Sequence, residues 1–268
     1  MSGRLNGKVC IVTGASSGIG KGIAQLFGRE GGKVVVAARR QDKGEAVAQS
    51  IRDEGGEATF IKTDMTDEQS IRDMVAKTAE IYGTVDVLIA NAGSSQEPFK
   101  FEDMDVAKHF TPLNDLIFKG NWIATSAVLP YMIEKKNGSV VYTLSYASDH
   151  SSSDCPAYAA NKAALESTAR SLAIQYGDRN IRFNSVLPGI ITSELSYEGS
   201  PLVDMLVKNI PMRRPGTPEE IAHVFLLLAT DECPFLTGAK IPVNGAMVNG
   251  EPPLGMGANL DYTGDAVK

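Results

Sequence analysis

The chain alternates short apolar runs with helical patterns along most of its length, and this alternation limits its fold more than any other feature. The apolar runs have the length of strands and lie at residues 9–12, 33–38, 59–63, 85–90, 139–144, 182–187 and 240–243. Helical patterns lie between them, at residues 21–29, 45–54, 68–82, about 103–135, 158–176 and 218–229. Such alternation predicts parallel strands joined by right-handed crossovers. We therefore expect an α/β fold: a single-domain, doubly wound parallel sheet of about seven strands with helices on both faces.

A glycine-rich turn follows the first apolar run. It reads Thr-Gly-Ala-Ser-Ser-Gly-Ile-Gly at residues 13–20, between the predicted strand and the predicted helix. Glycines let the backbone turn tightly and approach a pyrophosphate, whose charge suits the free N–H groups and positive end of the next helix. The spacing differs from the general G-x-G-x-x-G fingerprint, although the mechanics are the same. Turn chemistry alone is the other explanation, but the position between strand and helix favours a nucleotide.

Tyr158 and Lys162 are four residues apart, so both side chains would lie on one face of a helix. A tyrosine is a poor acid or base at neutral pH because its ordinary pKa is about 10. A nearby ammonium group stabilises the phenolate and moves that pKa toward the working range. A solvated helix pair would explain these two residues alone. Ser145, thirteen residues before Tyr158, and the glycine turn favour an acid–base site instead.

Together these motifs resemble the short-chain dehydrogenase/reductase family. The pattern T-G-x-x-x-G-x-G, the triplet Asn91-Ala92-Gly93, a serine, Y-x-x-x-K and Pro188-Gly189 occur in the family's order and spacing, over residues 5–245. The resemblance implies a Rossmann-type domain that transfers hydride between a nicotinamide cofactor and an alcohol or carbonyl. It implies that Tyr158 exchanges the proton, that Lys162 lowers the tyrosine pKa and binds the nicotinamide ribose, and that Ser145 holds the substrate oxygen.

The resemblance also implies the cofactor contacts. Asp64 matches a residue that binds the adenine amine, with capping of the next helix as its alternative role. Pro188-Gly189 would lie beside the nicotinamide, followed by Thr192 or Ser193, a choice that the spacing leaves open. The expected cofactor-binding residues are Gly14, Ser16, Ser17, Gly18, Ile19, Gly20, Arg39, Arg40, Asp64, Met65, Asn91, Ala92, Gly93, Tyr158, Lys162, Pro188, Gly189, Ile191 and Ser193.

The end of the second predicted strand favours NADP(H) over NAD(H). An NAD enzyme usually places an acid there to bind the 2′-hydroxyl of the adenosine ribose. This chain has Ala38 instead, followed by Arg39 and Arg40. A guanidinium binds a 2′-phosphate bidentately, whereas a carboxylate would repel it. Arg39 matches the basic residue of NADP-preferring family members, but Ser17 stands where a second basic residue is common. The alternative is that both arginines simply face solvent.

The chain departs from the family at one catalytic position. The family usually completes a tetrad with an asparagine thirteen residues before a proline, and counting back from Pro130 reaches Ile117. Isoleucine cannot bind the water through which the lysine's proton is thought to reach solvent. Asn114 and Asn121 are each about one turn away and are candidates to replace it. The proton relay is therefore left open, and Ile117 is not counted as catalytic.

Composition excludes several other functional classes. The formal net charge is −6 and no basic stripe occurs, which argues against a nucleic-acid partner. No stretch approaches the ~20 apolar residues of a membrane span, and no signal peptide is evident, so we expect a cytoplasmic protein. Neither a disulfide framework nor a metal site is expected, because no pairing or ligand spacing connects Cys10, Cys155, Cys233, His109, His150 and His223.

The substrate is predicted only as a class. We expect a catalytic domain at 1–249 with a lid at about 190–214, and an irregular tail at 250–268. Apolar lid candidates are Leu195, Tyr197, Leu202, Met205 and Leu206, and other pocket candidates are Tyr146, His150 and Cys155. These favour a bulky, apolar cyclic alcohol or ketone such as a hydroxysteroid. One alternative is a 3-oxoacyl-thioester (acyl carrier protein) reductase, because residues 242–245 of this chain resemble the end of such enzymes. Another alternative is a non-catalytic NADP(H)-binding sensor or scaffold.

The resemblance also implies assembly. Family members commonly form tetramers through the helix that carries Tyr158 and through the last strand. Small residues on that helix would allow close approach of a second copy, although they also suit packing on the sheet; they are Ala159, Ala160, Ala163 and Ala164. We therefore expect a homo-oligomer, a tetramer by resemblance, with the tail from Ala246 onward covering a neighbouring subunit's site or remaining irregular.

Overall fold

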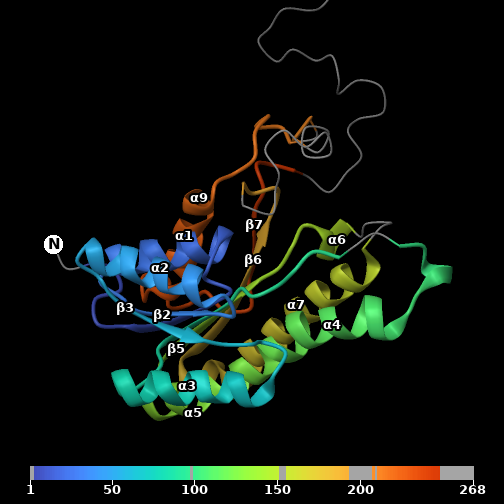
Figure 1. The fold of residues 1–268 in the computed structure, drawn as a ribbon. Helices are drawn as coiled ribbons and strands as arrows, with labels where there is room; N and C mark the ends of the chain where they lie inside the picture. Colours follow the sequence, from blue (N-terminus) through green and yellow to red (C-terminus); the bar gives the residue numbers. More distant parts are fainter. Residues whose placement is uncertain (1–2, 97–98, 151–154, 193–206, 209, 248–268) are drawn as a thin grey trace, which may run out of the picture.

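A parallel sheet of seven strands forms the centre of the protein, in the order β3-β2-β1-β4-β5-β6-β7 (Figure 1). The computed structural model describes residues 3–96, 99–150, 155–192, 207–208 and 210–247. The strands are β1 (Val9–Thr13), β2 (Lys33–Ala38), β3 (Glu57–Lys62), β4 (Val87–Ala90), β5 (Gly138–Thr143), β6 (Ile181–Pro188) and β7 (Lys240–Val243). The strand order reverses between β1 and β4, so the carboxyl ends of these strands border a crevice of the kind that binds ligands. The predicted fold class is confirmed.

Helices cover both faces of the sheet. One face carries α1 (Gly18–Arg29), α2 (Gln41–Asp53) and α9 (Pro218–Ala229), and the other carries α3 (Glu68–Tyr82), α5 (Gly120–Lys135) and α7 (Pro156–Tyr176) (Figure 1). Shorter elements are η1 (Phe101–Asp103), η2 (Val106–Phe110), α4 (Thr111–Leu113), η3 (Asn114–Lys119), α6 (Ala147–His150) and η4 (Gly177–Arg179). Among the described residues, no helix has both the length and the apolar character needed to cross a membrane.

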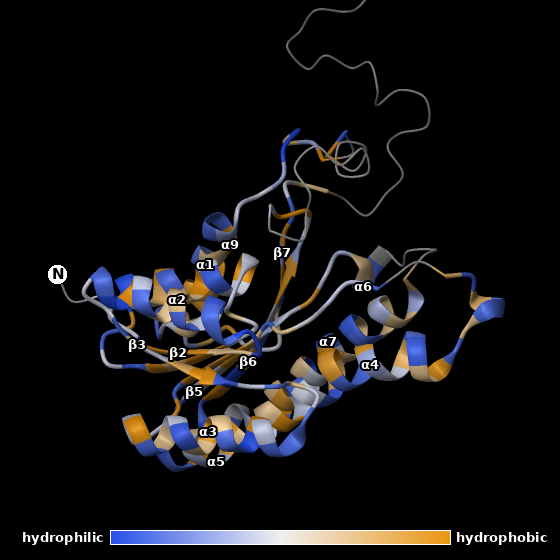
Figure 2. Ribbon diagram, in the orientation of Figure 1, coloured by the Kyte–Doolittle hydropathy of each residue, from blue (hydrophilic) through white to orange (hydrophobic). Residues whose placement is uncertain are grey.

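The strands place apolar side chains on both faces, as a sheet covered by helices on two sides requires. In β1, Ile11 packs into the cluster under α3, α5 and α7, while its neighbours Cys10 and Val12 pack into the cluster under α1, α2 and α9. Figure 2 shows the same pattern, with apolar strands and with helices whose polar residues face outward. Because both faces are buried, the strands read as continuous apolar runs in the sequence.

The element boundaries differ from the predicted ones chiefly at helix starts. The helix predicted at 45–54 begins at Gln41, and the one predicted at 158–176 begins at Pro156. Pro156 occupies the first turn, where the missing N–H of proline costs no hydrogen bond. The region predicted as helical at 103–135 contains two π-helical segments, η2 and η3, before α5. The lid residues 193–206, including Ser193, and the tail from 248 lie outside the described residues, so the division into domain, lid and tail stays a prediction.

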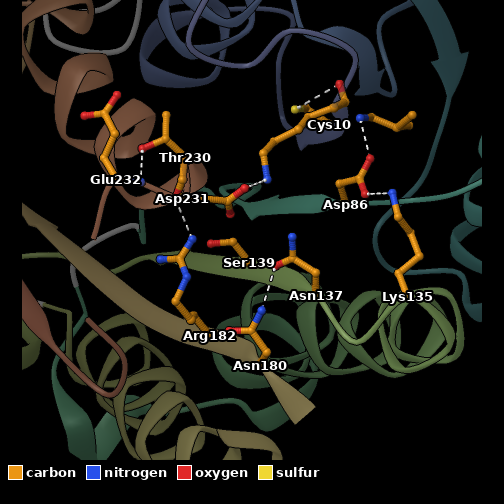
Figure 3. Close-up of polar contacts among 12 residues, drawn as sticks. Cys10, Asp86, Lys135, Asn137, Ser139, Asn180, Arg182, Thr230, Asp231 and Glu232 are labelled. Carbon is orange, nitrogen blue, oxygen red and sulfur yellow. Dashed lines mark hydrogen bonds and ion pairs between the residues drawn. The ribbon is translucent and has the colours of Figure 1, made fainter. Parts of the chain in front are cut away.

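Polar side chains tie the strands together at the amino edge of the sheet (Figure 3). The Asp86 carboxylate, just before β4, accepts the backbone N–H of Val9 at 2.9 Å and forms an ion pair with Lys135. On the other side, the buried Arg182 of β6 donates to the Thr230 carbonyl at 2.7 Å. These contacts secure one edge of the sheet, and the chemistry described below gathers at the opposite edge.

Gly120 is required where α5 approaches the chain after β3. A Cβ added there would lie 2.1 Å from the Met65 carbonyl oxygen, which is backbone and cannot move like a side-chain tip. Gly120→Ala is therefore expected to lower the free energy of unfolding by about 1–3 kcal/mol, as overpacking does. Urea denaturation would measure the change. The matched control is Gly177→Ala, since nothing lies within 4 Å of a Cβ added at Gly177, and an equal loss there would contradict the prediction.

Candidate active site

Two adjoining cavities lie at the carboxyl edge of the sheet. The first has a volume of about 430 Å³ and contains most of the predicted site residues; it is lined by Gly14, Ser17, Gly18, Ile19, Gly20, Asn91, Ala92, Gly93, Ser94, Ser95, Gln96, Thr143, Leu144, Ser145, Cys155, Tyr158, Lys162, Pro188, Gly189 and Ile191. The second, of about 370 Å³, lies toward β2 and is lined by Gly14, Ser16, Ser17, Ala37, Ala38, Arg39, Arg40, Thr63, Met65, Ala92, Gly93, Ser94 and Leu116. The shared residues make the two cavities one elongated site.

The glycine turn allows close backbone approach between β1, α1 and the chain after β4. Gly14 has a φ of +67°, and a Cβ there would lie 2.9 Å from the Ala92 Cα. A Cβ on Gly20 would lie 2.6 Å from the Gly14 carbonyl oxygen and 2.7 Å from Asn91 Nδ2. Side chains at these positions would therefore displace the loop. The turn presents the amino end of α1 to the cavity, which is the arrangement that suits a pyrophosphate.

Hydrogen bonds join the ends of three strands beside this turn. Thr13 Oγ1 accepts the N–H groups of Asn91 and Ala92 at 2.9 and 3.0 Å. Asn91 Nδ2 donates to the Thr13 carbonyl at 3.0 Å, and Asn91 Oδ1 accepts from Thr143 Oγ1 at 3.2 Å. Asn91 is therefore held on both sides, by β1 and by β5. Asn91 lines the first cavity, and Ala92 and Gly93 line both.

Ser145, Tyr158 and Lys162 come together in the first cavity. Ser145 follows β5, and its side chain lines the same cavity as Tyr158. Lys162 Nζ lies 5.8 Å from the centre of the Tyr158 ring and donates to the Thr143 carbonyl at 2.7 Å. The helix spacing and the strand end thus place the three predicted catalytic side chains as the sequence led us to expect.

Burial controls the electrostatics of this group. Lys162 is only 3% exposed, and the loss of hydration lowers its pKa from 10.5 to about 8. Burial also raises the pKa of Tyr158 above its ordinary value, and the hydrogen bond from Ser145 opposes that rise. The tyrosine is consequently a protonated donor at neutral pH in the ligand-free protein. The buried ammonium is the nearby positive charge that favours its phenolate.

Ile117 stands at the position of the expected asparagine, and both Ile117 and Lys162 lie close to Gly93. Ile117 is fully buried in η3, and a Cβ added at Gly93 would lie 3.5 Å from Lys162 Nζ and 3.9 Å from Ile117 Cγ1. Asn121 donates to the Ile117 carbonyl at 2.7 Å, whereas Asn114 donates to Asn161 Oδ1 at 3.0 Å. The two candidate asparagines therefore bond partners other than Lys162. The route of the relay stays a prediction.

The far cavity carries the predicted phosphate-binding residues. The Arg40 guanidinium donates to Ser16 Oγ at 3.0 Å and to Ser17 Oγ at 2.6 Å. Arg39 is exposed and lines the same cavity. Among the described residues that line it there is no aspartate or glutamate. This end of the site is positively charged and rich in hydroxyl groups.

Other predicted residues are placed less centrally. Asp64 accepts from the Thr66 N–H at 2.9 Å and from its hydroxyl at 2.8 Å, and these bonds hold the pKa of the Asp64 carboxyl below its usual range. The alternative role of Asp64 as a helix cap is wrong, because Asp67 caps α3. Met65 lines the second cavity. The Thr192 hydroxyl donates to the Gly216 carbonyl at 3.3 Å.

Of the predicted pocket residues near Ser145, one lines the cavity and one does not. Cys155 lines the first cavity, whereas Tyr146 packs against the hydrophobic core. The His150 side chain and the five lid candidates are outside the described residues.

Sequence reasoning missed several residues of the site. Thr13 is the first residue of the glycine turn, so its role had a local signal in the motif. Thr143 and Gln96 had none, because their contacts join segments far apart in the chain; Gln96 Oε1 accepts the Tyr158 N–H across 62 residues. Ser94 and Ser95, next to the triplet, also line the cavity.

These residues fit a nicotinamide cofactor, since the glycine turn leaves the space that a dinucleotide backbone needs and the cavity runs from Arg40 to Lys162. The family model described as Enoyl-(Acyl carrier protein) reductase matches residues 14–247. The chain is 34% identical to the 3-oxoacyl-[acyl-carrier-protein] reductase of Thermotoga maritima over 250 residues, 91% of this chain and 99% of that protein.

Two further comparisons agree. The 7alpha-hydroxysteroid dehydrogenase of Clostridium sardiniense is 32% identical over 253 residues, 93% of this chain and 96% of its own length. The crystal structure of gox2181 superimposes with a TM-score of 0.87 at 30% identity, over 91% of this chain and 96% of that one. Both the fold and the sequence therefore lead to one conclusion: this chain belongs to the short-chain dehydrogenase/reductase family, oxidoreductases that use a nicotinamide cofactor to interconvert CH–OH and C=O groups.

Proposed function

We propose that this protein is an NADP(H)-dependent oxidoreductase that interconverts a secondary alcohol and a ketone with Tyr158 as general acid and base. The observation that carries the proposal is the placement of the Tyr158 and Ser145 side chains in one cavity, beside the buried Lys162. Two hydroxyls at one point of a cavity can both bond a single carbonyl oxygen. A substrate oxygen placed there receives one proton from Tyr158 and one stabilising hydrogen bond from Ser145.

The proposed reaction transfers a hydride and a proton. A bound nicotinamide supplies the hydride for reduction, or accepts it in oxidation. In reduction, the Tyr158 hydroxyl gives its proton to the oxygen of the ketone, which becomes the hydroxyl of the alcohol. The phenolate left behind is stabilised by the Lys162 ammonium. In oxidation the same groups act in reverse.

The preference for NADP(H) rests on the charge of the second cavity. Arg40 is already directed to the hydroxyls of Ser16 and Ser17, and Arg39 lies beside it. A 2′-phosphate in this place would meet two guanidinium groups, two hydroxyls and no acidic side chain among the described lining residues. An NAD-specific site would need an acid at Ala38, which is apolar.

Cofactor binding tests this preference directly. Arg40→Ala is expected to weaken NADPH binding about ten- to a hundredfold, because a charge-assisted hydrogen bond is lost, and to leave NADH binding unchanged. Isothermal titration calorimetry with both cofactors would measure the change. Arg72→Ala, which removes an exposed arginine of α3, is the control. Wild-type protein that binds NADH as tightly as NADPH would overturn the proposed preference.

The substrate class is proposed as a bulky, apolar cyclic alcohol or ketone such as a hydroxysteroid. The named activity of the Clostridium sardiniense relative supports this class, and that of the Thermotoga maritima relative supports 3-oxoacyl thioesters as the second candidate. Consumption of NADPH with a 7-oxo bile acid, with 1-decalone and with acetoacetyl-coenzyme A would separate the two. Reaction of the thioester alone would reverse the ranking. Tight NADPH binding without turnover would favour the sensor or scaffold.

Assembly as a homotetramer and a cytoplasmic location complete the proposal. On α7, Ala160 and Ala163 are exposed small residues, and Ile174 is 86% exposed. An apolar side chain so exposed on the helix that carries Tyr158 supports burial against a second copy. Light scattering of the purified protein would determine the number of subunits.

A further inference from the structure

We propose that Gln96 is a positioning residue for Tyr158, holding the first turn of α7 through the tyrosine's backbone. Gln96 Oε1 accepts the Tyr158 N–H at 2.9 Å. Because a backbone N–H can only donate, the amide oxygen of Gln96 faces the helix, and this orients the side chain. The proposal rests on the proposed role of Tyr158 and adds to it the group that keeps this residue in place.

The start of α7 lacks the acceptor that a helix normally supplies for itself. The first N–H groups of a helix have no partner within it, and a Ser, Thr, Asp or Asn at the N-cap usually accepts one of them. The N-cap of α7 is Cys155, whose side chain makes no capping hydrogen bond. The next residue, Pro156, has no N–H. Tyr158 is the third residue of the helix, so its N–H needs an acceptor from elsewhere in the fold.

Gln96 belongs to the same segment as the triplet 91–93, which lines the first cavity. It follows Asn91, Ala92 and Gly93 in the chain, and Asn91 is bonded to both β1 and β5. Gln96 and Tyr158 line the same cavity as Gly93 and Lys162. The residue that holds the proton donor is thus attached to the segment that borders the cofactor. Through this connection, the position of residues 91–93 affects the position of the Tyr158 hydroxyl.

Such coupling affects turnover because proton and hydride transfer depend on position. A displacement of about 1 Å can reduce the rate about a hundredfold. Loss of the Gln96 acceptor lets the first turn of α7 fray, and Tyr158 moves with it. A direct contact between Gln96 and the substrate would instead be seen mainly in KM.

The experiment compares two substitutions of the same length. Gln96→Met removes the oxygen acceptor, whereas Gln96→Glu keeps an oxygen at the same place and adds a negative charge that suits a helix amino end. Gln49→Met, an exposed glutamine of α2, controls for the substitution itself. The first readout is deuterium exchange at the Tyr158 amide, resolved by fragmentation mass spectrometry. The second is kcat and KM for whichever ketone of the panel above the wild type reduces with NADPH.

The expected results are specific. Gln96→Met should speed exchange at the Tyr158 amide and lower kcat about ten- to a hundredfold with KM retained. Gln96→Glu should keep both the exchange rate at the Tyr158 amide and kcat close to the wild-type values. Ketone reduction is the direction to measure, because the added negative charge raises the tyrosine pKa and so keeps the proton donor protonated. Unchanged exchange in Gln96→Met, or a change in KM alone, would overturn the proposal. The exchange readout needs no turnover, so it is independent of the proposed function, which fails instead if Tyr158→Phe remains active.

Discussion

Tyr158→Phe is expected to abolish nearly all turnover while leaving NADPH binding intact. The substitution removes only the hydroxyl group, and the ring keeps its place in the cavity wall. Loss of a positioned general acid typically lowers a rate ~10²–10⁴-fold. Ketone-dependent NADPH consumption and calorimetric titration of the cofactor would measure the two quantities side by side.

The control for this variant lies on the same helix. Tyr176→Phe also removes one tyrosine hydroxyl from α7, but its ring lies against Phe183, 6.0 Å between centres, outside the cavity. Its turnover should match the wild type. Equal activity in Tyr158→Phe and Tyr176→Phe would eliminate Tyr158 as the proton donor and with it the proposed mechanism.

Lys162→Met is expected to have two opposite effects, lower turnover and higher stability of the ligand-free protein. The phenolate loses its neighbouring ammonium, so kcat should fall by ~10²-fold or more. The fall of the Lys162 pKa from 10.5 to about 8 corresponds to about 3 kcal/mol against the buried charge. The hydrogen bond from this ammonium to the Thr143 carbonyl is also lost, at about 1.5–3 kcal/mol for a charged donor, so a net gain in stability of about 0.5–2 kcal/mol near neutral pH is expected.

The difference in stability between Lys162→Met and the wild type should depend on pH. The folded-state pKa of Lys162 is lower than the unfolded value, so below about 8 both states are protonated and the destabilisation is complete. Between about 8 and 10.5 the folded protein loses the proton and the unfolded chain keeps it, so the destabilisation fades as pH rises. Urea denaturation of both proteins across this range should show their difference shrinking. A difference independent of pH would contradict the assignment of a buried charge.

The strongest predictions from sequence were those whose chemistry is local. The glycine turn works through residues adjacent in the chain, and Tyr158 and Lys162 are brought together by a single helical turn. Ser145 was found from its spacing, thirteen residues before Tyr158, and from the order of the family's motifs. In each case a short segment of sequence determines how the side chains lie relative to one another. The predicted alternation of strands and helices, which places these segments, is confirmed by the fold.

Contacts between distant segments were not predictable in this way. The acceptance of the Tyr158 N–H by Gln96 depends on how the chain after β4 folds over α7. The capping role considered for Asp64 was wrong because Asp67, three residues later, has the backbone geometry of the cap. The resemblance matched Arg39 to the basic residue of NADP-preferring members, whereas Arg40 donates to Ser16 Oγ, because adjacent side chains at a strand end point to opposite sides.

The polar contacts at the amino edge of the sheet have a consequence for how such a protein can diverge. Asp86 and Arg182 each bind a backbone group of another segment, so replacing either side chain leaves that backbone group without its partner. Changes at that edge therefore cost stability. The carboxyl edge carries loop residues that line the cavity, such as Ser94 and Cys155, where a replacement alters what is bound. New specificities can therefore accumulate one substitution at a time on a frame whose opposite edge resists change.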